Sequence, residues 1–304
     1  MKKYLKLNMN NNIPFFSVII PTYNRADLLA RCLKSLTEQT YKDFEVIVCD
    51  DGSTDNSKEI TDKYLDKLNI QYLWDVNWGG PARPRNRGIS AAKGDWICFL
   101  DSDDWWTPDK LENCLPYLDK NDIIFHPLQI FSENNGLQKK IMKGRQPKSP
   151  VFIDMLENEN CVNNSSVVIR RSIIDKVGPL CENKEFVSIE DYEYWIRISL
   201  VTELFFYIPK ILGYYWVGST SITMNNFQLN RINYIYDKFL VYVKDEKVKR
   251  EIISRQAYRN ARMHAKFGYN IEAHEYFKKA VYTKHLYTKL KAVLFYFINK
   301  QYLK

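Results

Sequence analysis

Short apolar runs alternate with segments of helical periodicity along the first hundred residues. Each run is five or six residues long, rich in β-branched or aromatic side chains, and ends in polar residues, which is typical of buried strands. Between the runs, apolar residues recur at helical spacing, as Leu29, Leu33 and Leu36 do. This alternation predicts an α/β fold with a mostly parallel, Rossmann-like sheet flanked by helices on both faces. The predicted strands are 15–20, 44–49, 70–74 and 96–100, and the predicted helices begin near residues 28, 53 and 86.

The second hundred residues follow the pattern less regularly. A helix predicted after Ser188, a plausible N-cap, carries Glu190 and Asp191 in its first turn. Residues 131–150 are polar without a clear period and predict a long loop. The apolar runs predict a strand or strand pair over 122–131, a strand over 167–170, and a closing hairpin from 204–208 and 211–217.

From residue 225 onward the pattern is helical and rich in Lys, Arg and Tyr. We therefore expect one domain over 1–220, with halves of about 15–105 and 106–220, and a basic helical C-terminal region over 221–304. Small residues predict a close contact between two of its helices. They are Ala261, Ala265, Gly268, Ala273 and Ala280.

The charge of the chain is concentrated in this last region. The net charge is +8, and residues 225–304 contain 17 Lys or Arg against 6 Asp or Glu. In its final segment, apolar residues share one helical face with lysines beside them, which fits either an anionic membrane surface or packing on its own domain. No nucleic-acid-binding signature accompanies the basic residues, so no nucleic-acid partner is expected. The apolar face comprises Leu286, Leu290, Val293, Leu294 and Phe297.

The six cysteines are scattered without a CxxC pair, as expected for reduced thiols in a cytoplasmic protein. Neither a signal-peptide h-region nor an apolar run of transmembrane length is found. The sequence therefore predicts a cytoplasmic protein, with peripheral binding at the inner face of the cell membrane as a further option.

Polar side chains follow three of the predicted strands. They are Thr22, Tyr23 and Asn24, then Asp50 and Asp51, then Asp101, Ser102, Asp103 and Asp104. Because parallel strands of such sheets bind ligands at their carboxyl ends, these tips should converge in one crevice. Crowded carboxylates repel one another unless a cation lies among them, and Mg2+ or Mn2+ prefers such oxygen ligands. The alternative is a solvated acidic turn ahead of a helix near Pro108.

The loop from Asn77 to Gly88 places Arg83, Arg85 and Arg87 between the acidic tips. Arginine forks suit a diphosphate or a base edge, although the loop could also simply neutralise nearby aspartates. Neither a dinucleotide fingerprint nor a P-loop is present. The pair Glu190 and Asp191 likewise fits either stabilisation by the helix dipole or catalysis.

Together these segments resemble the family 2 glycosyltransferases, which are inverting enzymes with the GT-A fold. The resemblance covers residues 15–217 in order and spacing, and it leaves the segment beyond residue 225 without a motif. The GGPARPRN loop is also similar to that of enzymes that add N-acetylglucosamine to wall polymers, but the sugar stays open. The matching motifs are VIIPTYN (18–24), VIVCDDGSTD (46–55), PRNRGI (84–89), FLDSDDWW (99–106) and EDYEYWIR (190–197).

The resemblance implies a site for a UDP-sugar donor and a divalent metal. Asp51 would contact the uracil, Asp101 the ribose, and Asp103 the metal, with Asp104 as an alternative ligand. Asp191 matches the general base of the family, which would deprotonate an acceptor hydroxyl. The resemblance further places Pro21, Tyr23, Asn24, Asn77, Arg85 and Ser102 around the nucleotide or diphosphate.

The expected function is transfer of a sugar from a UDP-sugar to a growing surface glycan, such as capsule, lipopolysaccharide or wall polymer. The acceptor would be a glycan or a lipid-linked glycan. Two alternatives remain: a nucleotide-sugar-binding protein without turnover, and a metal-dependent phosphatase built on Asp101 and Asp103. The phosphatase is less favoured because this acidic motif follows the fourth predicted strand, whereas that class places it on the first.

Overall fold

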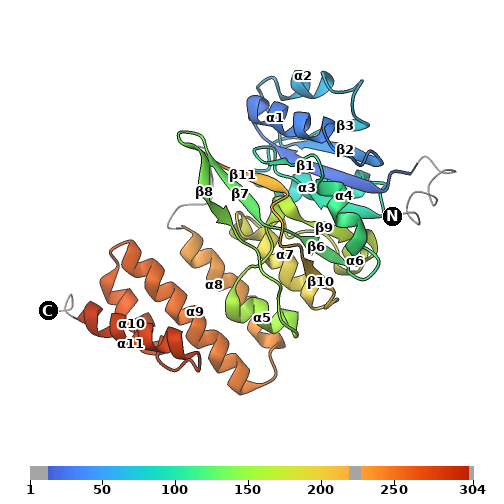
Figure 1. The fold of residues 1–304 in the computed structure, drawn as a ribbon. Helices are drawn as coiled ribbons and strands as arrows, with labels where there is room; N and C mark the ends of the chain where they lie inside the picture. Colours follow the sequence, from blue (N-terminus) through green and yellow to red (C-terminus); the bar gives the residue numbers. More distant parts are fainter. Residues whose placement is uncertain (1–12, 219–226, 301–304) are drawn as a thin grey trace. The chain divides into compact units, whose positions relative to one another are not determined.

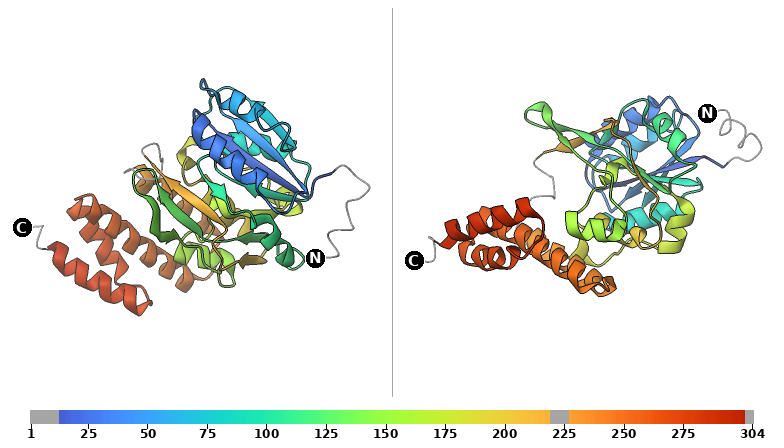
Figure 2. Two further views of the ribbon diagram at one scale, coloured as in Figure 1. Left: turned by 45° about the horizontal axis from the view of Figure 1, so that its top comes forward. Right: turned by 60° about the horizontal axis from the view of Figure 1, so that its bottom comes forward.

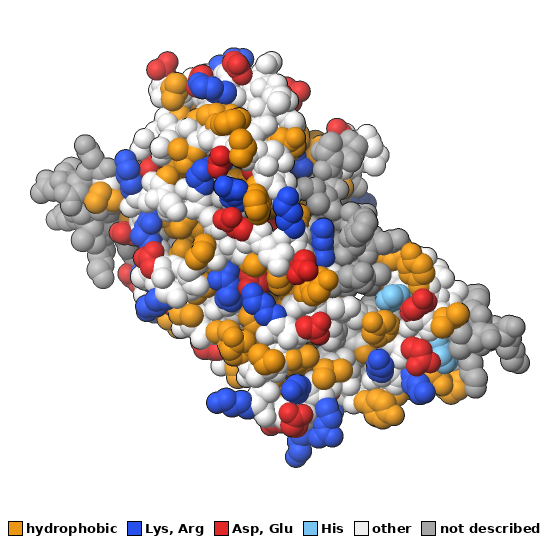
Figure 3. All heavy atoms as spheres, turned by 180° about the vertical axis from the view of Figure 1, so that it is seen from behind, with side chains coloured by type: hydrophobic (Ala, Val, Ile, Leu, Met, Phe, Trp, Pro, Cys, Tyr) orange, Lys and Arg blue, Asp and Glu red, His pale blue; other side chains and the backbone are white. Residues whose placement is uncertain are grey.

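The computed structural model describes residues 13–218 and 227–300, which form two compact units. The first comprises residues up to 147 together with 161–222, and the second comprises 148–160 and 223–304. This division differs from the predicted one, because residues 148–160 join the C-terminal helices. On the face shown in Figure 3, acidic, basic and apolar side chains are interspersed on both units.

A seven-stranded sheet in the order β10-β6-β9-β4-β1-β2-β3 forms the centre of the first unit (Figure 1). The neighbours of β1 and β2 are parallel to them, and β9 runs antiparallel to β4 and β6. The mostly parallel sheet predicted from the apolar runs is therefore confirmed. Its strands are β1 (Phe16–Thr22), β2 (Phe44–Asp50), β3 (Ile70–Trp74), β4 (Trp96–Phe99), β6 (Ile123–Phe125), β9 (Val168–Arg170) and β10 (Phe205–Tyr207).

Both faces of the central strands are buried, because successive side chains point to opposite faces and nearly all of them are apolar. Val18 and Val46 pack with Leu33 of α1 in the main core, whereas Ile19 faces α3. α3 lies close to the sheet at Gly88, where an added Cβ would be 2.5 Å from the Ile19 side chain. The helices of this unit are α1 (Ala26–Thr37), α2 (Ser57–Asp62), α3 (Ala82–Ala91), α4 (Lys110–Cys114), α6 (Arg171–Val177) and α7 (Glu190–Ser199).

A second, four-stranded sheet in the order β5-β11-β7-β8 corrects two predictions. The predicted loop over 131–150 contains an edge strand, whose mixed polar sequence has little periodicity because most of its residues are at least partly exposed. The predicted hairpin is wrong, because β10 joins the central sheet while β11 pairs with β5 and β7. The strands are β5 (Trp105–Trp106), β7 (Leu128–Ser132), β8 (Gly136–Met142) and β11 (Gly213–Val217).

The second unit is helical (Figure 2). Its core confirms the predicted contact for Ala261, Ala273 and Ala280, which are fully buried together with Phe277. Gly268 is not part of this contact, because it is exposed in the turn between α9 and α10, where its positive φ of 82° favours glycine. α5 joins this unit because Phe152 packs against Phe239, with ring centroids 6.4 Å apart. The helices are α5 (Val151–Asn158), α8 (Phe227–Phe239), α9 (Glu246–Lys266), α10 (Asn270–Ala280) and α11 (Leu286–Lys300).

Candidate active site at the carboxyl ends of the central strands

The polar tips of β1, β2 and β4 lie together, as predicted. The backbone amide of Asn24 donates to the hydroxyl of Ser53 at 2.8 Å, and the Asn24 side chain accepts from the amide of Thr54 at 2.8 Å. Asn24 adopts a positive φ of 48°, which asparagine tolerates better than most residues. Arg25, one residue on, reaches Asp103 beyond β4 at 2.6 Å. The three strand ends therefore lie beside one another, as the crevice predicted from the sequence requires.

Asp51 shapes the loop that follows β3. Its carboxylate accepts hydrogen bonds from the backbone amides of Trp78 and Gly79, both at 3.0 Å. The side chain of Asn77 donates to the Asp51 carbonyl at 2.9 Å. Gly52, at φ 86°, keeps this contact close, since a Cβ there would be 2.6 Å from the Asn77 nitrogen. Asp51 and Asn77, both predicted to contact the nucleotide, are thus side by side.

The three arginines predicted to lie on a loop belong to α3, which begins at Ala82 rather than near residue 86. Two of the three neutralise an aspartate, as the alternative interpretation proposed. Arg87 and Arg83 lie 3.1 and 3.9 Å from the carboxylate of Asp75. Arg87 also donates to the carbonyl of Asp50 at 2.6 Å, which ties α3 to the end of β2. The sequence reasoning did not identify Asp75 as their partner.

Arg85 is different, because it is buried and bridges two carboxylates. One arm donates to Asp101 at 2.6 Å and the other to Glu190 at 2.7 Å. Burial alone would lower the pKa of Arg85, but the two carboxylates raise it above its ordinary value. The bridge joins α3, the end of β4 and the start of α7. Both arms are thus engaged by protein groups rather than directed at a diphosphate.

Asp191 is the second residue of α7 and follows Glu190, which takes part in this bridge. Burial and the neighbouring Glu190 raise its pKa to about 7, although Arg85 acts in the opposite direction. One oxygen of its carboxylate accepts from the backbone amide of Tyr192 at 2.7 Å. The predicted cap, Ser188, is not the N-cap of α7, which begins after Ile189. A carboxylate with this pKa can exchange a proton near neutral pH.

The aspartates that follow β4 lie in two different environments. Asp101 and Asp103 are partly exposed at the strand ends, with 27% and 15% of their side chains accessible to solvent. Asp104 is buried and accepts from the backbone amide of Trp216 at 2.9 Å, so it faces the second sheet instead. Burial raises the pKa of Asp104 well above its usual range, with Asp103 adding to the effect. Ser102 is also buried.

Asp101 and Asp103 offer carboxylate oxygens, which are the ligands that a hard divalent cation prefers. Within the described residues, no group of three His, Cys, Asp or Glu side chains is placed to hold a metal ion. A metal at this site would therefore need oxygens of the substrate to complete its coordination. Asp104 is not brought to the same place.

The remaining predicted residues lie on β1 and just beyond it. Tyr23 is 46% exposed one residue beyond the end of β1, whereas Pro21 is buried within β1 opposite Cys49. Among the aromatic residues of β11, Tyr214 stacks on Trp105 with ring centroids 4.8 Å apart, and Trp216 is buried. Trp105 and Glu190 were not among the predicted site residues, although both are adjacent to residues that were.

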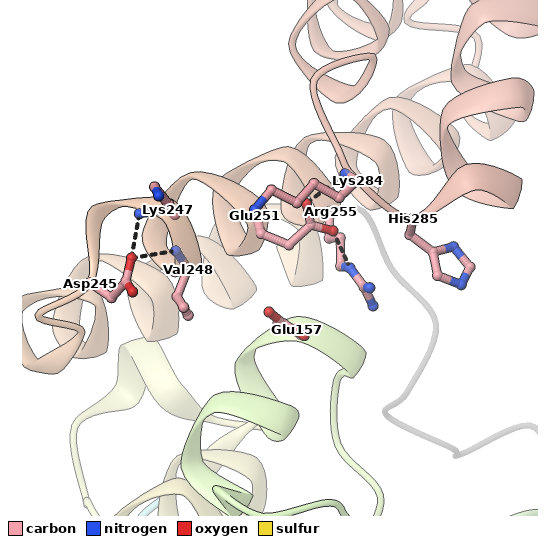
Figure 4. A pocket seen from close by; sticks show the side chains of 8 residues that line it. All are labelled: Glu157, Asp245, Lys247, Val248, Glu251, Arg255, Lys284 and His285. Atoms are coloured by element: carbon pink, nitrogen blue, oxygen red, sulfur yellow. Dashed lines mark hydrogen bonds and ion pairs between the residues drawn. The ribbon is translucent and has the colours of Figure 1, made fainter.

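A separate pocket of about 410 Å3 lies within the second unit (Figure 4). Its charges serve mainly its own helices: Glu251 accepts from Arg255 at 2.8 Å and from the amide of Lys284 at 2.7 Å. Asp245 caps α9 by accepting from two backbone amides. These bonds explain the charged side chains of the pocket by their role in the structure of the second unit.

Known proteins with similar sequences are glycosyltransferases. Residues 17–178 match the model of glycosyl transferase family 2. An uncharacterized glycosyltransferase of Haemophilus influenzae is 30% identical over 240 residues, which cover 78% of this chain and 91% of that protein. Escherichia coli WfaP, a UDP-Glc:alpha-D-GlcNAc-diphosphoundecaprenol beta-1,3-glucosyltransferase, is 28% identical over 212 residues, or 70% of this chain and 81% of that protein.

The poly(ribitol-phosphate) beta-N-acetylglucosaminyltransferase TarS of Staphylococcus aureus is similar in sequence and in fold. It is 30% identical over 190 residues, which cover 61% of this chain and 32% of that protein. Its 1–349 fragment in complex with UDP-GlcNAc superposes with a TM-score of 0.67 at 20% identity, covering 94% of this chain and 90% of that one. The GT-A fold expected from the sequence is thereby confirmed, and the chain belongs to glycosyl transferase family 2.

Proposed function

We propose that this glycosyltransferase transfers a sugar from a UDP-sugar, with inversion, to a hydroxyl of a growing surface glycan. The observation that carries the proposal is Asp191, a carboxylate beside Glu190 and Arg85 whose pKa is raised to about 7. Similarity to WfaP and TarS, whose names specify UDP-glucose and N-acetylglucosamine transfer, supports a UDP-sugar donor. WfaP also supports a lipid-linked acceptor, by its diphosphoundecaprenol substrate.

The donor half of the site is assigned to the crevice formed by β1, β2 and β4. We place the base and ribose against Tyr23, Asn24, Asp51 and Asn77, with Asp101 on the ribose side. The buried Pro21 and Ser102 support this wall rather than line it. Two further residues, Arg85 and Glu190, fix the position of Asp101 relative to the start of α7.

Asp103 and Asp101 would hold Mn2+ or Mg2+ together with oxygens of the diphosphate. Such a cation stabilises the negative charge that develops on the departing UDP. Arg25 contacts Asp103 in the structure and is the positive charge nearest to this carboxylate in the described contacts. Asp104 supports the second sheet and has no part in this assignment.

The proposed transfer needs a single general base, which we assign to Asp191. Asp191 accepts the proton of the acceptor hydroxyl, whose oxygen bonds to the anomeric carbon. The bond between that carbon and the diphosphate oxygen breaks on the opposite face, and its electron pair leaves with UDP. Inversion needs no second carboxylic acid, unlike the paired carboxylates of a glycoside hydrolase.

The first experiment measures UDP release from a panel of UDP-sugars with Mn2+ and with EDTA. We expect slow hydrolysis of one donor that is lost with EDTA and in Asp103→Ala. Ser90→Ala, on the outer side of α3, is the matched control and should retain the rate. Binding of UDP without release from any donor, even with lipid-linked acceptors present, would instead favour a nucleotide-sugar-binding protein. Hydrolysis of simple phosphomonoesters would favour the phosphatase.

A further inference from the structure

The last helix, α11, has two different apolar faces. Its inner face packs on the other C-terminal helices through Ala292, which is fully buried. There the Phe295 ring stacks on Phe277 at 5.5 Å, and the Tyr296 ring stacks on His274 at 4.3 Å. Small and aromatic residues thus attach α11 to its own unit.

The larger aliphatic side chains of α11 lie on the opposite side, and we call this surface the α11 outer face. Its members are between 37% and 69% exposed. Their spacing of three, four and seven residues makes them a continuous stripe along the helix. The α11 outer face comprises Leu286, Tyr287, Leu290, Val293, Leu294 and Phe297.

The segment that contains this stripe carries charge of one sign. Residues 276–304 contain seven lysines and no Asp or Glu. Lys289 is an exposed residue of α11, and the ammonium of Lys291 lies 4.1 Å from the centroid of the Tyr287 ring. An apolar stripe flanked by lysines and aromatic rings has the composition of helices that lie in the interface of an anionic bilayer.

We propose that the α11 outer face binds an anionic lipid surface, with the helix axis parallel to the bilayer. Its aliphatic side chains would enter the acyl boundary while the lysines contact lipid phosphates. No described helix is long and apolar enough to cross a membrane, so the proposed attachment is peripheral. The inference concerns the second unit alone and does not depend on the donor or the acceptor of the reaction.

A second copy of the chain is the main competing occupant. A two-fold contact through this face would bring two sets of lysines together without an acidic partner, because residues 276–304 contain none. Charge complementarity therefore favours lipid phosphates over another α11. The other helices of the second unit already pack on the inner face of α11, so they do not cover its outer face.

The test is flotation of the full chain with vesicles of phosphatidylcholine alone or with 3:7 phosphatidylglycerol to phosphatidylcholine, a ratio of about one anionic lipid in three. We expect binding to the anionic vesicles that weakens as salt is raised. The triple variant Leu290→Gln, Leu294→Gln and Phe297→Gln should bind at least about tenfold more weakly, since each change removes apolar surface that the lipid would bury. Lys289→Gln with Lys291→Gln should also lose about tenfold or more, at roughly 1 kcal/mol for each lysine.

Control variants remove leucines or lysines from exposed positions elsewhere. Leu65→Gln with Leu137→Gln controls for lost apolar surface, and Lys63→Gln with Lys120→Gln controls for lost charge; all four positions are exposed. These variants should bind as the unchanged protein does. Circular dichroism melting and UDP-sugar hydrolysis establish that every variant is folded.

Three results would overturn the proposal. The first is failure of the unchanged protein to bind anionic vesicles, and the second is equal binding by the outer-face variant and its control. The third is a dimer, measured by sedimentation equilibrium, that dissociates in the outer-face variant while vesicle binding is unaffected. In that case a second copy covers the face. None of these results bears on Asp191 or the donor crevice, so failure here leaves the proposed reaction intact.

Discussion

At the scale of single residues, the proposed chemistry depends on the protonation of Asp191. Because the base must be deprotonated, activity should rise with pH through about 7, the value to which burial and Glu190 raise its pKa. Asp191→Asn should reduce kcat by about 100-fold or more, the usual contribution of a general base. The measurements are kcat against pH for the unchanged enzyme and UDP binding by the variant, which should be retained. A flat profile between pH 5 and 9, or full activity of Asp191→Asn, would exclude this role.

The neighbouring carboxylate gives a second prediction with a defined sign. The negative charge of Glu190 raises the pKa of Asp191, whereas the positive charge of Arg85 lowers it. Glu190→Gln should therefore move the acid limb of the pH profile to lower pH. Arg85→Met should move it to higher pH, along with a loss of stability from leaving buried carboxylates unpaired. Shifts in the same direction in both variants would show that the bridge acts only through the fold.

Arg25 gives a prediction about the metal that does not require turnover. Its guanidinium is 2.6 Å from Asp103, a predicted ligand, so the arginine and a divalent cation compete for one carboxylate. Arg25→Ala should bind Mn2+ about threefold to tenfold more tightly, as expected for removal of a half-buried ion pair worth about 1 kcal/mol. Electron paramagnetic resonance of free Mn2+, with UDP present to supply the remaining oxygen ligands, measures this affinity. Lys63→Ala, which removes an exposed cation elsewhere, should leave the affinity unchanged, and unchanged affinity in Arg25→Ala would contradict the competition.

At the scale of elements, α3 can lie close against the sheet because Gly88 has no side chain at the point of contact. A Cβ at Gly88 would lie 2.5 Å from Ile19 and 2.8 Å from the sulfur of Cys49. Gly88→Ala should therefore lower the free energy of unfolding by about 1–3 kcal/mol, the cost of overpacking a close contact. Ser90→Ala, two residues along the same helix, should change it by less than about 0.5 kcal/mol. Urea unfolding compares the two, and equal midpoints would show that the sheet yields to the added methyl group.

The central strands were predictable from sequence because each is a continuous apolar run buried on both faces. The edge strand β8 was not, since partial exposure leaves it without the alternation that marks a half-buried strand. The strands β10 and β11 were predicted as a hairpin because they are adjacent in sequence. Their partners lie far away along the chain, on β6 and on β5 and β7, and no local pattern specifies such pairing.

At the scale of the whole molecule, the second unit cannot be removed by cutting the chain after the first. α5 belongs to it and buries Phe152 and Met155, although residues 148–160 lie between segments of the first unit. A chain ending at residue 222 should therefore expose α5 and aggregate. The same truncation with residues 148–160 replaced by a Gly/Ser linker of equal length should be more soluble. Size-exclusion chromatography distinguishes them, and equal solubility would show that α5 does not need its C-terminal partners.

The family, the parallel sheet and the meeting of three polar strand ends could be predicted from the sequence, because they follow from local periodicity and from motifs in a fixed order. The distribution of the charges could not, and it became visible in the folded chain. There Arg85 pairs with Asp101 and Glu190, Asp104 faces the second sheet, and α11 is attached by Ala292, Phe295 and Tyr296 rather than by its leucines. The physical reason is that ion pairing and burial depend on groups distant in sequence, and a short motif does not specify which of several adjacent side chains will meet them.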